Sequence, residues 1–175
     1  MNLYKKLSPN PDISVKSLRY LEENNLIYND RLFYNVIDSH HYFLSVPEIS
    51  DFFKTLNLSC RAVSLIKIFQ NNVGIHTDNS PNQGITVRIN IPILNAEYSR
   101  TVFYENFNEK KITKELKNGA VYFEFADRDC KEIDSVCIDV PTAINVSVPH
   151  RVICERFPRL ALSFHLTPNP EHLLL

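Results

Sequence analysis

The chain lacks any long hydrophobic segment. No run of about 18 uninterrupted apolar residues occurs in it, which excludes a predicted transmembrane helix. Residues 1–12 contain two lysines but no apolar stretch of the kind that a signal peptide needs. We therefore expect a cytoplasmic protein that no membrane segment anchors.

A strong charge of either sign is also absent. Nineteen basic residues oppose 20 acidic ones, for a formal net charge of -1. Nucleic-acid-binding domains usually carry a basic patch, so the charge balance gives no support to nucleic-acid binding. There are no internal repeats, and 44% of the 175 residues are hydrophobic. This composition is typical of one globular domain and leaves small-molecule or peptide chemistry open.

Closely spaced cysteines are missing as well. Zinc sites and redox motifs usually bring two cysteines within a few residues of each other. The four cysteines here have irregular spacing, and we expect four buried or half-buried free thiols. They are Cys60, Cys130, Cys137 and Cys154.

The first third of the chain has helix signals. Asp12 fits the N-cap of a helix over residues 13–23. Ser45 and Glu48 have the spacing of a capping box and predict a second helix that ends near Leu56. In the segment between these helices, His40 and His41 are interpreted as a solvated pair.

From Cys60 onward the hydrophobic period changes to two, which is typical of strands. Residues 31–37 fit either a strand or an extended segment. The strand-like segments after Cys60 are residues 62–69, 85–93, 101–105, 120–125, 135–139, 143–153 and 160–166.

Seven or eight short strands behind two helices, without strand–helix alternation, predict a mainly β protein with N-terminal helices. The expected architecture is an antiparallel sandwich or jelly roll, also called a double-stranded β-helix. We expect a single domain in which the N-terminal helical segment, residues 1–58, packs on a jelly-roll core formed by residues 59–175.

Two of the predicted strands have one apolar and one polar face. Arg88 and Asn90 lie on the polar face of one strand, and Arg159, Ser163 and His165 on that of the last. If the apolar faces pack beneath the N-terminal helices, the polar faces line a pocket inside the sandwich. The alternative is that the polar faces are solvated and the apolar faces form its core.

His76 and Asp78 stand two residues apart at the end of an apolar run. In a strand, side chains at i and i+2 point to the same side, so both can reach one point. His150 continues the otherwise apolar parity of residues 144–152, which suggests that it points inward. Two histidines and one carboxylate are the ligand set that binds non-haem Fe(II) and leaves coordination positions open. The sequence thus predicts a catalytic metal site at these three residues.

Arg159 follows His150 by nine residues, and a guanidinium can bind a carboxylate through two hydrogen bonds. The set His76-x-Asp78, Asn145-Val-Ser-Val-Pro-His150-Arg-Val and Arg159-Leu-Ala-Leu-Ser163 resembles the Fe(II)/2-oxoglutarate-dependent oxygenases. The similarity is to their prolyl-hydroxylase-like and aspartyl/asparaginyl-hydroxylase-like branches, and it covers about residues 60–167.

This resemblance implies that His76, Asp78 and His150 bind iron and that Arg159 forms a salt bridge with the distal carboxylate of the co-substrate 2-oxoglutarate. It also implies a dioxygenase that consumes O2, hydroxylates its substrate, and releases succinate and carbon dioxide. The expected substrate is an amino acid or other small carboxylate, or a peptide side chain. The N-terminal segment is a candidate surface for a homodimer.

Three more residues are candidates for binding the co-substrate. Ser163 shares a strand face with Arg159, although it follows by four residues and not by the two of the R-x-S pattern of some relatives. Arg88 either assists Arg159 or binds a carboxylate of the substrate. Tyr104 either hydrogen-bonds to 2-oxoglutarate or is a core tyrosine with a bonded hydroxyl.

Two other functions stay open. A cupin-like metal enzyme that does not use 2-oxoglutarate would keep the metal ligands without needing Arg159. A metal-free jelly-roll binding or structural module would use His76 and His150 as hydrogen-bonded core residues. The charged segment 127–134 is a solvated turn or, alternatively, a lid.

Overall fold

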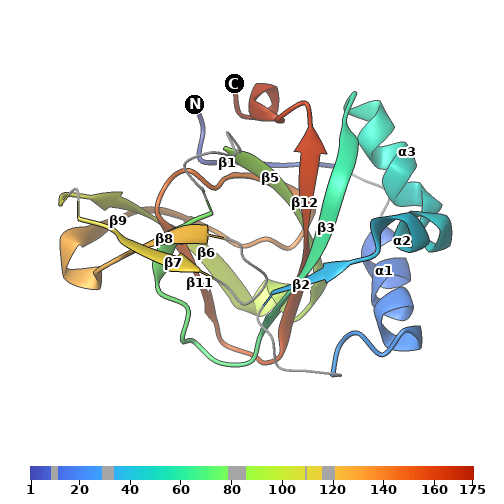
Figure 1. The fold of residues 1–175 in the computed structure, drawn as a ribbon, viewed down its shortest axis with the longest axis horizontal. Helices are drawn as coiled ribbons and strands as arrows, with labels where there is room; N and C mark the ends of the chain where they lie inside the picture. Colours follow the sequence, from blue (N-terminus) through green and yellow to red (C-terminus); the bar gives the residue numbers. More distant parts are fainter. Residues whose placement is uncertain (9–11, 29–33, 79–85, 109, 116–120) are drawn as a thin grey trace.

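The computed structural model describes residues 1–8, 12–28, 34–78, 86–108, 110–115 and 121–175. Within them, twelve strands form two six-stranded antiparallel sheets (Figure 1). In order across it, the first sheet contains β1 (Tyr4–Lys6), β10 (Thr142–Asn145), β5 (Val87–Leu94), β12 (Arg159–Thr167), β3 (Ser59–Ile68) and β2 (Tyr34–Ile37). The second contains β7 (Ile112–Glu115), β8 (Val121–Phe125), β4 (Ile75–Thr77), β11 (His150–Cys154), β6 (Ser99–Asn106) and β9 (Cys130–Val136). The prediction of a mainly β protein is confirmed.

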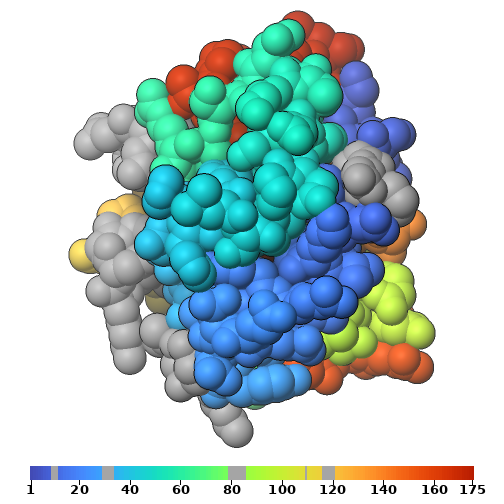
Figure 2. Space-filling view, turned by 90° about the vertical axis from the view of Figure 1, so that its right-hand side faces the viewer, coloured from blue at the N-terminus to red at the C-terminus, as the bar shows by residue number. Residues whose placement is uncertain are grey.

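Three helices cover the outer face of the first sheet beside β2 and β3 (Figure 1). They are α1 (Asp12–Glu23), α2 (Ser39–Ser45) and α3 (Pro47–Thr55). Figure 2 shows their side chains forming a continuous layer on that side of the molecule. Short 3₁₀ turns lie at η1 (Ala96–Tyr98), η2 (Asp127–Asp129) and η3 (Glu171–Leu174). None of the helices in the described ranges has both the length and the hydrophobicity needed to cross a membrane.

The main hydrophobic core lies between these helices and the first sheet. The ring of Phe164, on β12, packs against Phe53 of α3 with centroids 4.9 Å apart and against Tyr42 of α2 at 6.2 Å. Leu162 and Ile89 are fully buried in the same cluster. The apolar faces of the two patterned strands therefore pack beneath the helices, as the first of the two interpretations predicted.

The predicted helix over residues 13–23 is confirmed as α1. The second predicted helix is confirmed as α3 in its range but not in its capping. Ser45 is the last residue of α2, where its hydroxyl donates to the His41 carbonyl, so the predicted capping box is wrong. Val46 is the N-cap of α3, and its side chain makes no capping hydrogen bond. His41 belongs to α2, a helix that the sequence did not predict, and Asp38 caps it by accepting a hydrogen bond from the His41 amide.

The predicted strand over residues 143–153 is wrong, because it is two strands that lie in different sheets. The Asn145 side chain accepts hydrogen bonds from the amide and the hydroxyl of Ser147 and so forms a turn. Pro149 then precedes β11 without an amide donor. The chain crosses from β10 to β11 at this turn, yet Ile144, Val146, His150 and Val152 all line one cavity, so His150 points inward as predicted.

The other strands agree with the sequence to differing degrees. Those over residues 62–69, 101–105 and 160–166 correspond to β3, β6 and β12. Ile85, Ala120 and residues 31–33 lie outside the described residues. The charged segment is not simply a turn, because β9 spans Cys130–Val136 as an edge strand with exposed charged side chains, which protect such an edge from further pairing.

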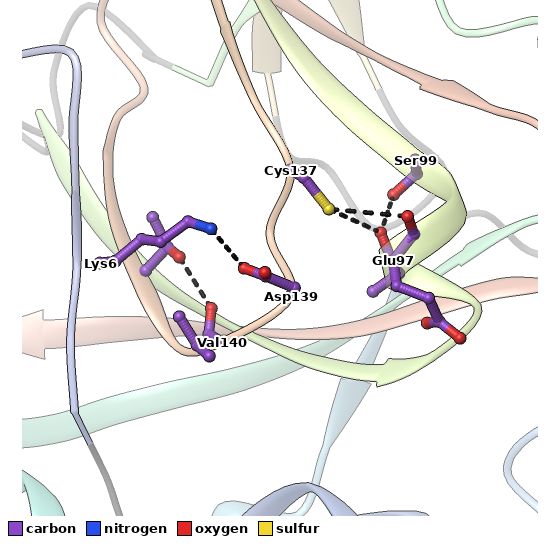
Figure 3. Close-up of polar contacts among 8 residues, drawn as sticks. Lys6, Glu97, Ser99, Cys137, Asp139 and Val140 are labelled. Atoms are coloured by element: carbon purple, nitrogen blue, oxygen red, sulfur yellow. Dashed lines mark hydrogen bonds and ion pairs between the residues drawn. The ribbon is translucent and has the colours of Figure 1, made fainter.

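Residues 1–58 are not purely helical, since β1 and β2 form the two edges of the first sheet. β1 pairs with β10, and the Lys6 ammonium lies 2.6 Å from the Asp139 carboxylate (Figure 3). In the same view the Cys137 thiol faces the carbonyl oxygens of Ala96 and Glu97 at 3.7 Å. All four cysteines are free thiols, three half-buried and one buried, as predicted.

Replacing Phe164 by alanine should lower the free energy of unfolding by about 3 to 5 kcal/mol, because it leaves a cavity where three rings meet. Urea denaturation followed by circular dichroism measures the change. Phe107→Ala is the matched control, since that ring is 65% exposed, and it should cost less than about 0.5 kcal/mol. Equal losses in the two variants would contradict this description of the core.

Candidate metal centre

A cavity of about 390 Å³ lies between the two sheets. The first sheet contributes the polar face of β5, with Arg88 and Asn90, and that of β12, with Arg159 and Ser163. The second sheet contributes residues from β4, β6, β8 and β11. The polar faces of the two patterned strands thus line a pocket inside the sandwich and are not solvated.

Three predicted ligands meet on the second sheet's side of this cavity. β4 pairs with β11 in the register that places His76 directly opposite His150, and Asp78 follows β4 by one residue. The Asp78 Oδ1 atom lies 3.4 Å from Nε2 of His76 and 4.0 Å from Nε2 of His150. One ligand atom from each residue falls within 4.8 Å of the other two, a group that could hold a metal ion.

Both imidazole rings are held by their far nitrogen atoms. Nδ1 of His76 donates to the Gly74 carbonyl and Nδ1 of His150 to the Val148 carbonyl, each at 2.9 Å. Because a carbonyl oxygen only accepts, the proton of each neutral ring stays on Nδ1 and the Nε2 lone pair points toward Asp78. This is the orientation that metal-binding histidines adopt when their second nitrogen is fixed by a backbone carbonyl.

The pKa shifts in this cluster oppose one another, because each group responds to its own balance between burial and the charges around it. Burial opposes the ionisation of Asp78, but contact with His76 and the charge of Arg88, whose Nε lies 3.2 Å from Oδ2, hold the pKa of Asp78 well below its ordinary range. Burial also disfavours a charged His76, yet Asp78 outweighs it and raises the pKa of His76. Burial and the neighbouring His76 lower the pKa of His150 to about 4. The cluster therefore favours one positive charge beside its carboxylate, a place that a divalent cation can take.

Arg159 is a buried charge without a counter-ion. Its side chain is 1% exposed, its Nε has no hydrogen-bond partner, and no described residue forms an ion pair with it. Burial lowers its pKa, and the charges of the Cys154 and Cys137 thiols oppose this shift only in part. A guanidinium nevertheless stays charged, and a buried charge is costly unless an anion accompanies it.

No protein-family model matches this chain, and no curated protein matches it either. The chemistry of the cavity therefore has to be inferred from its own side chains. They provide a histidine–carboxylate cluster on one wall and an unpaired guanidinium on the other.

The remaining predicted residues have different positions. Ser163 lines the cavity on the same face of β12 as Arg159, and Arg88 lines it while contacting Asp78. Tyr104 does not line it: its hydroxyl accepts a hydrogen bond from Arg151 at 2.9 Å and its ring packs with Ile75. The structure agrees with the second interpretation of Tyr104, a core tyrosine with a bonded hydroxyl, because the residue does not line the cavity.

Several lining residues were not predicted, among them Tyr34, Asn72, Tyr122 and Glu124. Tyr122 meets His76 edge-on with ring centroids 5.9 Å apart. Glu124 is the β8 residue directly opposite His76. The alternation in residues 121–125 places both on one strand face, but only the pairing of β8 with β4 shows that this face borders the cavity.

Manganese(II) or anaerobic Fe(II) should raise the melting temperature of the wild-type protein, and a chelator should reverse the shift. At 100 times its dissociation constant, a metal that binds only the folded state adds about 2.7 kcal/mol of stability. Differential scanning fluorimetry measures the shift, which His76→Ala should abolish. His172→Ala, in an exposed residue of η3, should preserve it, and a shift that survives His76→Ala would refute the site.

His165 should make the protein less stable in mild acid. Its Nε2 is buried without a partner, and burial together with the charge of Arg88 lowers its pKa to about 4 from 6.5. Between these values the unfolded chain binds a proton that the folded protein does not, so stability falls as the pH falls. Urea denaturation between pH 7 and about pH 4.5 should show a smaller loss for His165→Gln than for wild type. The exposed control His40→Gln should leave the loss unchanged.

Proposed function

We propose that the protein is an Fe(II)- and 2-oxoglutarate-dependent oxygenase with a jelly-roll core, which hydroxylates a small molecule or a peptide side chain. One observation carries this proposal. A single cavity combines the cluster of His76, Asp78 and His150 with Arg159, a buried guanidinium that has no anionic partner among the described residues.

The order of strand pairing supports a jelly-roll core. Successive strands from β3 to β6 lie alternately in the first and second sheets, and so do those from β9 to β12. These eight strands lie in the order β10-β5-β12-β3 in the first sheet and in the order β4-β11-β6-β9 in the second. Such interleaving of early and late strands in two facing sheets is expected for a double-stranded β-helix.

The donor set fits iron. Two neutral imidazoles and a carboxylate on adjacent positions form the facial arrangement of non-haem Fe(II) sites, which leaves positions for a co-substrate and O2. The chemistry that bound iron supplies is activation of O2 coupled to oxidative decarboxylation of 2-oxoglutarate to succinate and carbon dioxide. No thiol belongs to the cluster, and thiolates are the ligands that structural zinc sites prefer.

The two cavity arginines have separate tasks in this proposal. Arg88 is a positioning residue: it holds Oδ2 of Asp78, so that Oδ1 faces the two histidines. Arg159 binds the distal carboxylate of 2-oxoglutarate, assisted by Ser163 on the same strand face. Ile66, Ile144 and Val152 complete the wall and exclude water, which strengthens the interaction between guanidinium and carboxylate.

The two other candidate functions, a metal-free module and a cupin-like enzyme, explain fewer of the polar contacts and charges in the cavity. A metal-free module would satisfy the Nε2 atoms of both histidines with neutral hydrogen-bond partners, whereas here both face one carboxylate. A cupin-like enzyme without 2-oxoglutarate has no use for a fully buried arginine that lacks a counter-ion.

Anaerobic addition of Fe(II) and 2-oxoglutarate should produce a metal-to-ligand charge-transfer band in the visible spectrum. Arg159→Met should weaken 2-oxoglutarate binding by about 10- to 100-fold, because a charge-assisted hydrogen bond contributes roughly 1.5 to 3 kcal/mol. Titration of the band measures the change, and Arg100→Ala, in an exposed arginine of β6, should leave it unaltered.

The same variant has a second expected result. Because Arg159 is a buried charge that forms no ion pair with any described residue, methionine at this position should leave the stability of the ligand-free protein unchanged or increase it. Urea denaturation tests this. Absence of the band in the wild-type protein would refute the oxygenase, and a large loss of stability in Arg159→Met would assign the arginine a structural role instead.

A further inference from the structure

One carboxylate in the cavity has no partner. Glu124 lines the cavity from β8, and no described residue forms a hydrogen bond or an ion pair with it. The pairing of β8 with β4 places Glu124 directly opposite His76, so their Cβ atoms are about 5 Å apart. The charged side chain therefore stands beside the metal ligands, within reach of whatever molecule lies against them.

The backbone at Gly74 makes room for this carboxylate. A Cβ atom on Gly74 would lie 3.2 Å from both Cγ and Cδ of Glu124, closer than ordinary packing allows. Gly74 also provides the carbonyl that holds Nδ1 of His76. The absence of a side chain at position 74 thus lets Glu124 lie against the segment that orients a metal ligand.

The charge of Glu124 contributes to the raised pKa of His76, but that ring is already in contact with Asp78, and the arginine and lysines near Glu124 are also engaged elsewhere. Arg88 contacts Asp78, and Lys111 lies over the Phe123 ring at 4.0 Å, on the opposite face of β8. Lys114 is opposite Tyr122 in the β7–β8 pair, but it forms no ion pair with Glu124. If Arg159 binds the co-substrate, as in the proposed function, Glu124 is the described cavity carboxylate left to be matched by the substrate.

We propose that Glu124 determines substrate specificity by binding an organic cation, a primary ammonium or a guanidinium group. Tyr122 lies on the same face of β8 and lines the cavity, so its ring can add a cation–π contact. The proposal rests on the proposed function, because the metal that His76, Asp78 and His150 would hold beside Glu124 would supply the chemistry that oxidises a carbon near the bound cation. A free amine or basic amino acid and a lysine or arginine side chain of a peptide carry this same chemistry.

Matched pairs of probes test the proposal and separate its two sources. L-arginine with L-citrulline and L-lysine with L-norleucine form the free series, and the Nα-acetyl, N-methylamide derivatives of the same amino acids form the peptide-like series. Isothermal titration calorimetry measures their binding to protein loaded with Zn(II) and N-oxalylglycine and to protein without additions. In at least one series the member with the side-chain cation should bind at least about tenfold more tightly than the partner that lacks this cation.

Glu124→Gln keeps the shape of the side chain and should reduce that preference to less than about twofold. Glu105→Gln, in an exposed strand glutamate of the same sheet, should preserve the preference. Binding of N-oxalylglycine should be unchanged in both variants, which shows that the cavity is intact. Equal binding or no binding of both members of every pair overturns the proposal, and so does a preference that persists in Glu124→Gln.

The charge-transfer band separates this failure from failure of the proposed function. A normal band without a cation preference would support the oxygenase function and refute the proposal that its substrate is a cation. A cation preference without a band would support the role of Glu124 in binding and refute the oxygenase.

Discussion

The register of β4 against β11 is the constraint on which the site depends. It sets His76 directly opposite His150, two residues that are 74 positions apart in the chain. Side chains opposite each other on one sheet face have their Cβ atoms about 5 Å apart, so the pairing alone brings the two imidazoles together. A shift of one residue would turn one histidine to the other face of the sheet. The backbone carbonyls of Gly74 and Val148 then fix the rings, so the ligand set is built largely from main-chain geometry.

The helical layer explains why polar residues face the inside of this sandwich. Because α1, α2 and α3 cover the outer face of the first sheet, the apolar sides of β5 and β12 have their core there. The opposite sides of these strands need not be apolar, and they carry Arg88, Asn90, Arg159 and Ser163 into the space between the sheets. The N-terminal segment therefore contributes to the site by freeing an inner sheet face for chemistry, and its Tyr34 also lines the cavity.

Some charged side chains in the cavity are paired with opposite charges and others are not. The functional interpretation of the cavity depends on this difference. Asp78 has Arg88 and two histidines around it, whereas neither Arg159 nor Glu124 forms an ion pair with any described residue. Buried or half-buried charges without partners cost stability, and they are retained where a ligand completes them. A buried guanidinium favours binding of an anion, and a carboxylate in the cavity favours binding of a cation. The two side chains can therefore distinguish an anionic co-substrate from a cationic substrate.

The sequence by itself determined the mainly β class, the helices around residues 13–23 and 47–55, and the identity of His76, Asp78, His150 and Arg159 as the residues to bring together. These follow from local chemistry: the hydrophobic period and the kinds of atoms that metals and carboxylates prefer. Tertiary structure decided the rest. A period of two separates the faces of a strand but does not say which face meets the core, so two interpretations of Tyr104 stayed open, and Tyr122 and Glu124 were missed. Nor does it reveal that β10 and β11 belong to different sheets, because strand pairing joins residues that are distant in the chain.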